Sequence, residues 1–98
     1  MYVILTTKPG VFKTVISDGV VPVESYDYLF YGRKRANFTI AELANDKARI
    51  TIVEDEPPQI TNSVPSKLFE KFDSLDEARG ELNTLTHYGS MDIVLKPV

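Results

Sequence analysis

Residues 24–43 place the strongest constraint on the fold, because they read as two extended segments joined by a glycine turn. Successive side chains of a strand point to opposite faces. One face of the first segment would therefore carry the aromatic rings of Tyr26, Tyr28 and Phe30, and the other face would carry Asp27, Leu29 and Tyr31. Gly32 can adopt the positive φ that a tight turn needs. We predict a β-hairpin that turns at Gly32.

Other runs rich in β-branched and aromatic residues predict further strands at residues 2–7, 11–16, 49–53 and 91–95. The Lys8-Pro9-Gly10 sequence is a turn signal, so the first two of these strands should form a hairpin of their own. Another turn is expected at Asn45-Asp46-Lys47, before the strand at 49–53. Short connections favour antiparallel neighbours.

Two consecutive helices are expected near the C-terminus. Residues 64–72 begin with a proline suited to a first helical turn and place Leu68, Phe69 and Phe72 at helical intervals. A second helix should start at Ser74, whose hydroxyl can cap the helix while Glu77 reaches back to the Ser74 amide, as in a capping box. Its apolar stripe would consist of Leu75, Ala78, Leu82 and Leu85.

Two glycines carry separate expectations for this second helix. Gly89 is placed to end it, since glycine is common just after a helix C-terminus. Gly80 lies inside it, where glycine lowers stability by roughly 1 kcal/mol relative to alanine, so we expect close packing against another backbone there.

These patterns together predict an α+β fold: a mainly antiparallel sheet of five to six strands, with the two consecutive helices packed on one face. A length of 98 residues predicts one domain over residues 1–98. The expected core includes one strand residue and three helix residues: Ile52, Phe69, Phe72 and Leu82.

Composition limits the chemistry that the chain can perform. The absence of cysteine excludes disulfides and thiolate metal sites, and the single histidine, His87, argues against a histidine-rich metal centre. We expect no cofactor and no metal. The sequence has no signal-peptide pattern and no run approaching the roughly 20 apolar residues of a membrane helix, which predicts a cytoplasmic protein without membrane association.

Charge is distributed unevenly about a net value of -3. Residues 1–49 contain seven Lys and Arg against five Asp and Glu, whereas residues 50–98 contain four against nine. This asymmetry could orient an encounter with a partner, but it is more typical of a helical half with an acidic solvated face.

The aromatic strand and its basic turn are the candidate partner-binding site. Its residues are Tyr26, Tyr28, Phe30, Tyr31, Arg33, Lys34 and Arg35. No nucleotide-binding, nucleophile-elbow or zinc-peptidase pattern occurs, so we expect no catalytic residues and a small accessory or regulatory protein that acts by protein–protein binding. A two-fold dimer that buries part of residues 26–31 or 20–23 is expected, because one helical layer covers only one face of a sheet.

Two other functions remain open as alternatives. The same aromatic and basic side chains could bind single-stranded nucleic acid, although the acidic net charge opposes a polyanion. An enzyme could use His87 as a general base beside Tyr88 and Asp92, although a histidine at a helix C-terminus can simply interact with the helix dipole. The acidic residues 54–56 are expected to form a solvated loop.

Overall fold

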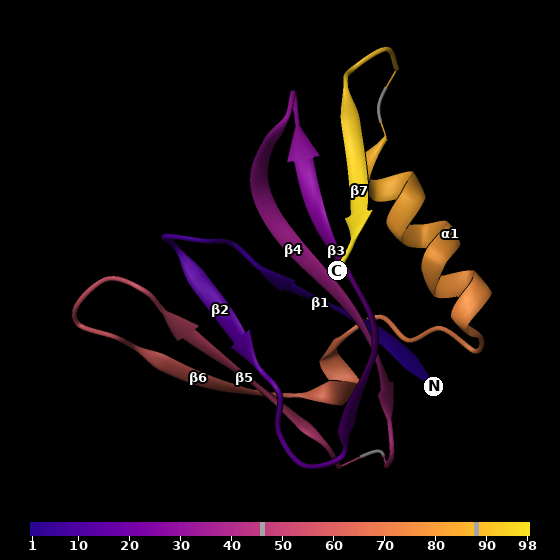
Figure 1. Cartoon of the computed structure of the whole chain (residues 1–98). Coiled ribbons are helices and arrows are strands. Elements are labelled where there is room, and N and C mark those ends of the chain that lie inside the picture. Colours follow the sequence, from indigo (N-terminus) through magenta and orange to yellow (C-terminus); the bar gives the residue numbers. More distant parts are fainter. Residues whose placement is uncertain (46, 88) are drawn as a thin grey trace.

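A computed structural model describes residues 1–45, 47–87 and 89–98. Within these residues the chain forms seven strands, one short 3₁₀ helix and one α-helix (Figure 1). The strands are β1 (Tyr2–Thr7), β2 (Phe12–Val15), β3 (Val20–Phe30), β4 (Arg33–Leu43), β5 (Arg49–Glu54), β6 (Thr61–Pro65) and β7 (Ile93–Pro97). The helices are η1 (Ser66–Leu68) and α1 (Leu75–Thr86).

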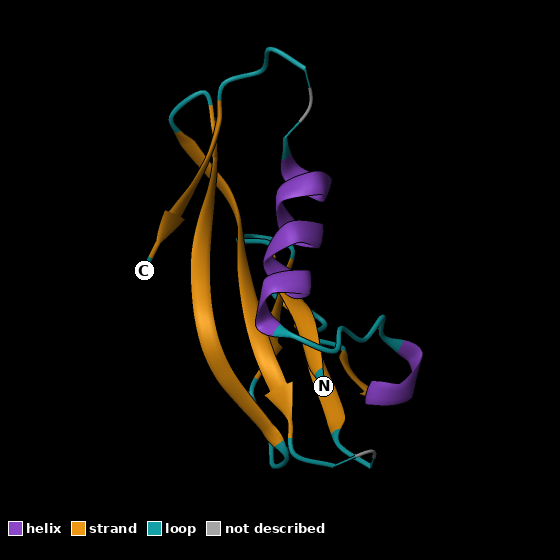
Figure 2. Cartoon of the chain, turned by 90° about the vertical axis from the view of Figure 1, so that its right-hand side faces the viewer, coloured by secondary structure: helices purple, strands orange, loops and turns teal. Residues whose placement is uncertain are grey.

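The strands form two antiparallel sheets in three layers with the helix. A four-stranded sheet has the order β1-β4-β3-β7, and a three-stranded sheet has the order β2-β5-β6. The three-stranded sheet packs against one face of the larger sheet at β1, the start of β3 and the end of β4, while α1 lies on the opposite face (Figures 1 and 2). The larger sheet is thus the middle layer of the molecule.

Two hydrophobic clusters occupy the two sides of this middle layer. The cluster between the sheets contains Val3, Leu5, Val20, Ala41, Leu43, Ala48 and Ile50. The cluster under α1 contains Ile40, Phe72, Ala78 and Leu82. Ile40 and Ala41 are consecutive in β4 and both are fully buried, because neighbouring side chains of a strand point into different layers.

The predicted α+β fold, with one sheet of five to six strands and two C-terminal helices, is wrong. Residues 64–72 do not form a helix: Pro65 has the extended angles φ -58° and ψ 136°, and it ends strand β6 opposite Arg49. Only η1 follows, and Leu68 is 71% exposed although its spacing predicted an inward position. The apolar residues of this segment that are buried lie on extended backbone. Their helical spacing in the sequence is therefore a coincidence.

The expected hairpin of the first two strands is also wrong. β1 pairs with β4 and β2 pairs with β5, so the two strands belong to different sheets. Their connection does turn at Pro9 and Gly10, but the backbone hydrogen bonds there form only an isolated bridge between Lys8 and Phe12. The turn therefore carries the chain from one sheet to the other.

The central hairpin is confirmed, with β3 and β4 paired along their length. Its two turn residues both have positive φ, 51° at Tyr31 and 78° at Gly32, as a type I′ turn requires. This turn type matches the twist of the flanking strands. The strand predicted at 49–53 is confirmed as β5, and the closing strand lies two residues later than expected, at Ile93–Pro97.

The four predicted core residues divide by degree of burial. Phe72 and Leu82 are buried in the cluster under α1. Ile52 and Phe69 are partly buried and pack against the cluster between the sheets. Leu85, expected on the apolar stripe of the helix, is exposed.

The N-terminus of α1 begins where the capping signal predicted. Ser74 Oγ accepts a hydrogen bond of 3.1 Å from the Glu77 amide. The Glu77 carboxylate accepts from the Asp73 amide at 3.0 Å rather than from the Ser74 amide, so the reciprocal bond is displaced by one residue. The helix ends at Thr86 with His87 as its C-cap, before Gly89 is reached. The described helices include none that is long and apolar enough to cross a membrane.

Gly80 does not pack closely against another backbone, and that expectation is wrong. A Cβ built at Gly80 has no atom of another element within 4 Å, and the residue is exposed. Gly80→Ala should therefore raise the free energy of unfolding by about 0.5–1 kcal/mol, because alanine is the better helix former. Denaturant melts would measure this gain. Gly32→Ala is the matched control and should be destabilising, since φ is +78° there.

Candidate protein-binding surface

The basic tip, which we define as Phe30, Tyr31, Arg33, Lys34 and Arg35, lies at the end of the molecule far from the N-terminus (Figure 1). Tyr31 is 59% exposed. Its amide donates a 2.9 Å hydrogen bond to the Asp92 carbonyl, and its ring meets that of Phe30 edge to face at 4.7 Å. The turn therefore presents an exposed aromatic ring on an anchored backbone.

The cations of the basic tip differ in their surroundings. Lys34 Nζ lies 3.3 Å from Asp27 Oδ1, which offsets part of its charge. The pKa of Asp27 is lowered, mainly by a hydrogen bond from Asn37 and further by Lys34. Arg33 and Arg35 are exposed and form no ion pair within the described residues. These two guanidinium groups provide the uncompensated charge of the tip.

The structure separates the seven predicted site residues into two groups. Phe30, Tyr31 and the three cations remain together at the tip. Tyr26 instead packs against the cluster under α1, and its hydroxyl donates to Glu24 at 2.7 Å. The Tyr28 ring meets Phe38 edge to face at 5.9 Å. Tyr26 and Tyr28 thus contribute to packing beside the helix.

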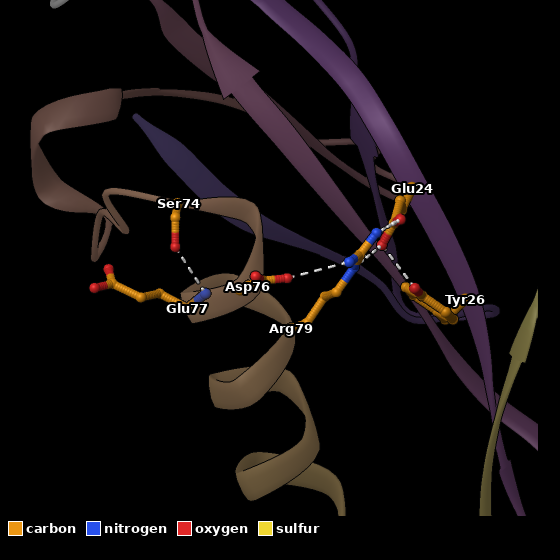
Figure 3. A network of polar contacts seen from close by, with 6 residues as sticks. All are labelled: Glu24, Tyr26, Ser74, Asp76, Glu77 and Arg79. Atoms are coloured by element: carbon orange, nitrogen blue, oxygen red, sulfur yellow. Dashed lines mark hydrogen bonds and ion pairs between the residues drawn. The ribbon is translucent and has the colours of Figure 1, made fainter.

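An ion-pair network that the sequence did not indicate joins α1 to β3 (Figure 3). Arg79 binds both carboxylate oxygens of Glu24, with Nε donating at 2.8 Å, and it also lies 3.3 Å from Asp76. Tyr26 donates to the same Glu24 carboxylate. Hydrogen bonds from Arg79 and then from Tyr26 lower the pKa of Glu24 to about 2, and Glu24 in turn raises the pKa of Tyr26.

The network predicts a specific loss of stability in acid. Because the pKa of Glu24 falls from 4.5 to about 2 on folding, its contribution is fully present above pH 4.5 and is lost as the pH drops toward 2. Glu24→Gln and Arg79→Met should each flatten the fall in unfolding free energy over this interval. Denaturant melts at several pH values would measure it. Glu54→Gln changes an exposed carboxylate of β5 and should retain the wild-type slope; equal slopes in all four proteins would contradict the prediction.

A pocket of about 180 Å³ lies between α1, the segment after η1 and the first strand of the larger sheet. We call it the acidic pocket; it is lined by Ile4, Thr6, Phe38, Phe69, Glu70, Phe72, Glu81 and Leu85. Five of these eight side chains are apolar or aromatic, and the other three are the Thr6 hydroxyl and the two carboxylates. Glu70 and Glu81 come from different elements, and neither forms an ion pair within the described part of the chain. Only the acidic character of residues 50–98 hinted at such a site in the sequence.

The remaining candidates from the sequence do not form a catalytic arrangement in the described residues. His87 Nδ1 lies 3.1 Å from Thr86 Oγ1 and 3.2 Å from the Asn83 carbonyl, at the end of α1. Tyr88, named with it, and Asp46, in the turn expected at 45–47, lie outside the described residues. Residues 54–56 lie at the end of β5 and in the loop beyond it, and no group of three His, Asp or Glu within the described ranges is placed to hold a metal ion.

The fold and this surface define a class: a two-sheet antiparallel β protein with one covering helix and an exposed basic-aromatic hairpin turn. Comparison of the chain with protein-family models, curated proteins and solved structures found no match.

Proposed function

We propose that this protein acts by binding another protein through the basic tip. The observation that carries the proposal is the exposed ring of Tyr31, whose backbone is held by a type I′ turn and by the bond from its amide to the Asp92 carbonyl. It lies beside two arginines that form no ion pair within the described residues. Tyrosine and arginine, together with tryptophan, are enriched among the residues that dominate binding energy at interfaces. A preformed turn also binds with a smaller loss of conformational entropy than a mobile loop.

The chemistry of the tip favours an acidic protein surface as its target. The planar guanidinium groups of Arg33 and Arg35 can each form two parallel hydrogen bonds with a carboxylate. Single-stranded nucleic acid has less support, because the rings of Tyr26 and Tyr28 are engaged beside α1 and are not arranged with Tyr31 as one stacking surface. The net charge of -3 also opposes a polyanion.

Affinity capture from the native extract tests this proposal. The wild-type chain should retain a protein partner in stoichiometric amount, and the double variant Arg33→Glu/Arg35→Glu should lose it. Lys13→Glu/Lys67→Glu is the matched control, because it makes the same charge change at two exposed lysines outside the tip and should retain the partner.

Two results would contradict the proposal. One is capture of the same proteins by the wild type and by the tip variant. The other is salt-sensitive binding of labelled oligonucleotides, measured by fluorescence anisotropy, that disappears in the tip variant while no protein partner is found. That second result would favour the nucleic-acid alternative.

A further inference from the structure

We infer that the protein surface bound by the basic tip is the acidic pocket of a second copy of this chain, with Tyr31 entering the pocket. This inference rests on the proposed function and names the partner. The two sites are complementary in shape and in charge, and each argument is independent of the other.

The pocket has the size and lining for one aromatic ring. Its volume is about 180 Å³, and an apolar cavity of about 150 Å³ is sufficient to bind benzene. The rings of Phe38, Phe69 and Phe72 contribute to its wall, where edge-to-face contacts with an entering tyrosine are favourable. Tyr31 is the most exposed aromatic residue of the described chain.

Charge complementarity points to the same pairing. Glu70 and Glu81 line the pocket without ion-pair partners in the described residues. Arg33 and Arg35, which follow Tyr31 at the start of β4, also form no ion pair there. Docking would place two guanidinium groups beside two carboxylates. The charge asymmetry of the sequence agrees with this pairing, because the tip belongs to the basic half of the chain and both carboxylates belong to the acidic half.

The contact has to form between copies, because one copy cannot make it internally. The basic tip is the turn between β3 and β4, the two central strands of the larger sheet, and the Tyr31 amide is held there by its bond to Asp92. Phe38 of the pocket lies on β4 six residues after Gly32, which is about 20 Å along an extended strand. A tyrosine side chain on a fixed turn does not span that distance.

The assembly that follows is set by symmetry. Each copy has one tip and one acidic pocket, so two copies related by a two-fold axis can make the contact twice and close as a dimer. Any other rotation gives a ring or a longer chain of copies. Both cases remove Tyr31 from solvent.

Charge exchange between two variants tests the pairing. The tip variant Arg33→Glu/Arg35→Glu and the pocket variant Glu70→Arg/Glu81→Arg should each associate at least about tenfold more weakly than the wild type, because like charges then face each other. An equimolar mixture of the two variants should associate again, since the acidic tip of one matches the basic pocket of the other. This recovery cannot result from unfolding.

Sedimentation and small-angle scattering would measure the association. A single copy has a radius of gyration of 13.7 Å, and size scaling gives about 16 Å for a compact dimer. Tyr31→Ser should abolish association while leaving the charges unchanged. A wild-type value near 13.7 Å at every concentration up to about 1 mM would overturn the inference. So would association that persists in both variants, or a mixture of the variants that stays monomeric.

The pocket variant separates failure of this inference from failure of the proposed function. If a different protein is the partner, its capture should be lost in the tip variant and retained in the pocket variant, and the wild type should be monomeric. That outcome refutes pairing between copies while supporting protein binding by the tip.

Discussion

Phe72→Ala should lower the free energy of unfolding by about 3–5 kcal/mol. The side chain is 9% exposed and packs with Ile40, Ala78 and Leu82 under α1. Its backbone is fixed by two hydrogen bonds with Tyr2, at 2.8 and 2.9 Å, so the chain cannot readily shift to fill the cavity. Small domains have a total stability of about 5–15 kcal/mol, so this single change removes a large part of it.

Denaturant melts check this value, with Leu68→Ala as the control. Leu68 is close in sequence but 71% exposed, and its replacement should change the free energy of unfolding by less than about 0.5 kcal/mol. A loss below about 1 kcal/mol at Phe72 would contradict its position in the core. Slow hydrogen exchange of the Phe72 amide would independently support its bond to the Tyr2 carbonyl.

The features that could be predicted from the sequence are those decided by neighbouring residues. The central hairpin depends on alternation along β3 and β4 and on Gly32, all of which act over a few positions. The start of α1 depends on Ser74 and Glu77, three residues apart. Phe30, Tyr31 and the cations of the basic tip lie at one turn, as the sequence indicated, because a hairpin holds consecutive residues together.

The features that could not be predicted depend on pairing between distant segments. Alternation identifies a strand but does not specify its neighbour, so β1 and β2 were expected to pair although each pairs elsewhere. Strand β6 begins with Thr61, Asn62 and Ser63, which give no apolar alternation because this edge strand is exposed there. Phe69 and Phe72 have the spacing of residues on one face of a helix, but they pack against two different clusters. Their spacing therefore does not reflect a helix.

The same limit applies to the candidate site. Glu24 and Arg79 are 55 residues apart, and no local pattern links a carboxylate in a strand to an arginine on a helix. The acidic pocket combines residues from β1, β4, the segment after η1 and α1. Its two carboxylates could be seen in the sequence only as part of an acidic half, without any indication that they face aromatic rings.

Ile50→Ala should lower the free energy of unfolding by about 2–5 kcal/mol, because it leaves a cavity in the core on the other side of the middle sheet. Ile50 is 1% exposed and belongs to the cluster between the two sheets, with Leu5 and Ala41 among its members. Ile16→Ala is the matched control, because Ile16 is 44% exposed and its replacement should lower the free energy of unfolding much less. Denaturant melts of the two variants measure the difference, and equal losses would place Ile50 outside the core.

The melt of Ile50→Ala should also remain a single transition, because the two clusters share strand β4. Ile40 lies in the cluster under α1 and the adjacent Ala41 lies between the sheets, so β4 cannot separate from one layer without disturbing the other. Far-ultraviolet circular dichroism reports the whole backbone, and tyrosine fluorescence reports chiefly the larger sheet. Coincident curves from the two probes would support this coupling. A first transition seen by circular dichroism alone would mean that the three-stranded sheet unfolds independently, and that α1 and the larger sheet are stable without it.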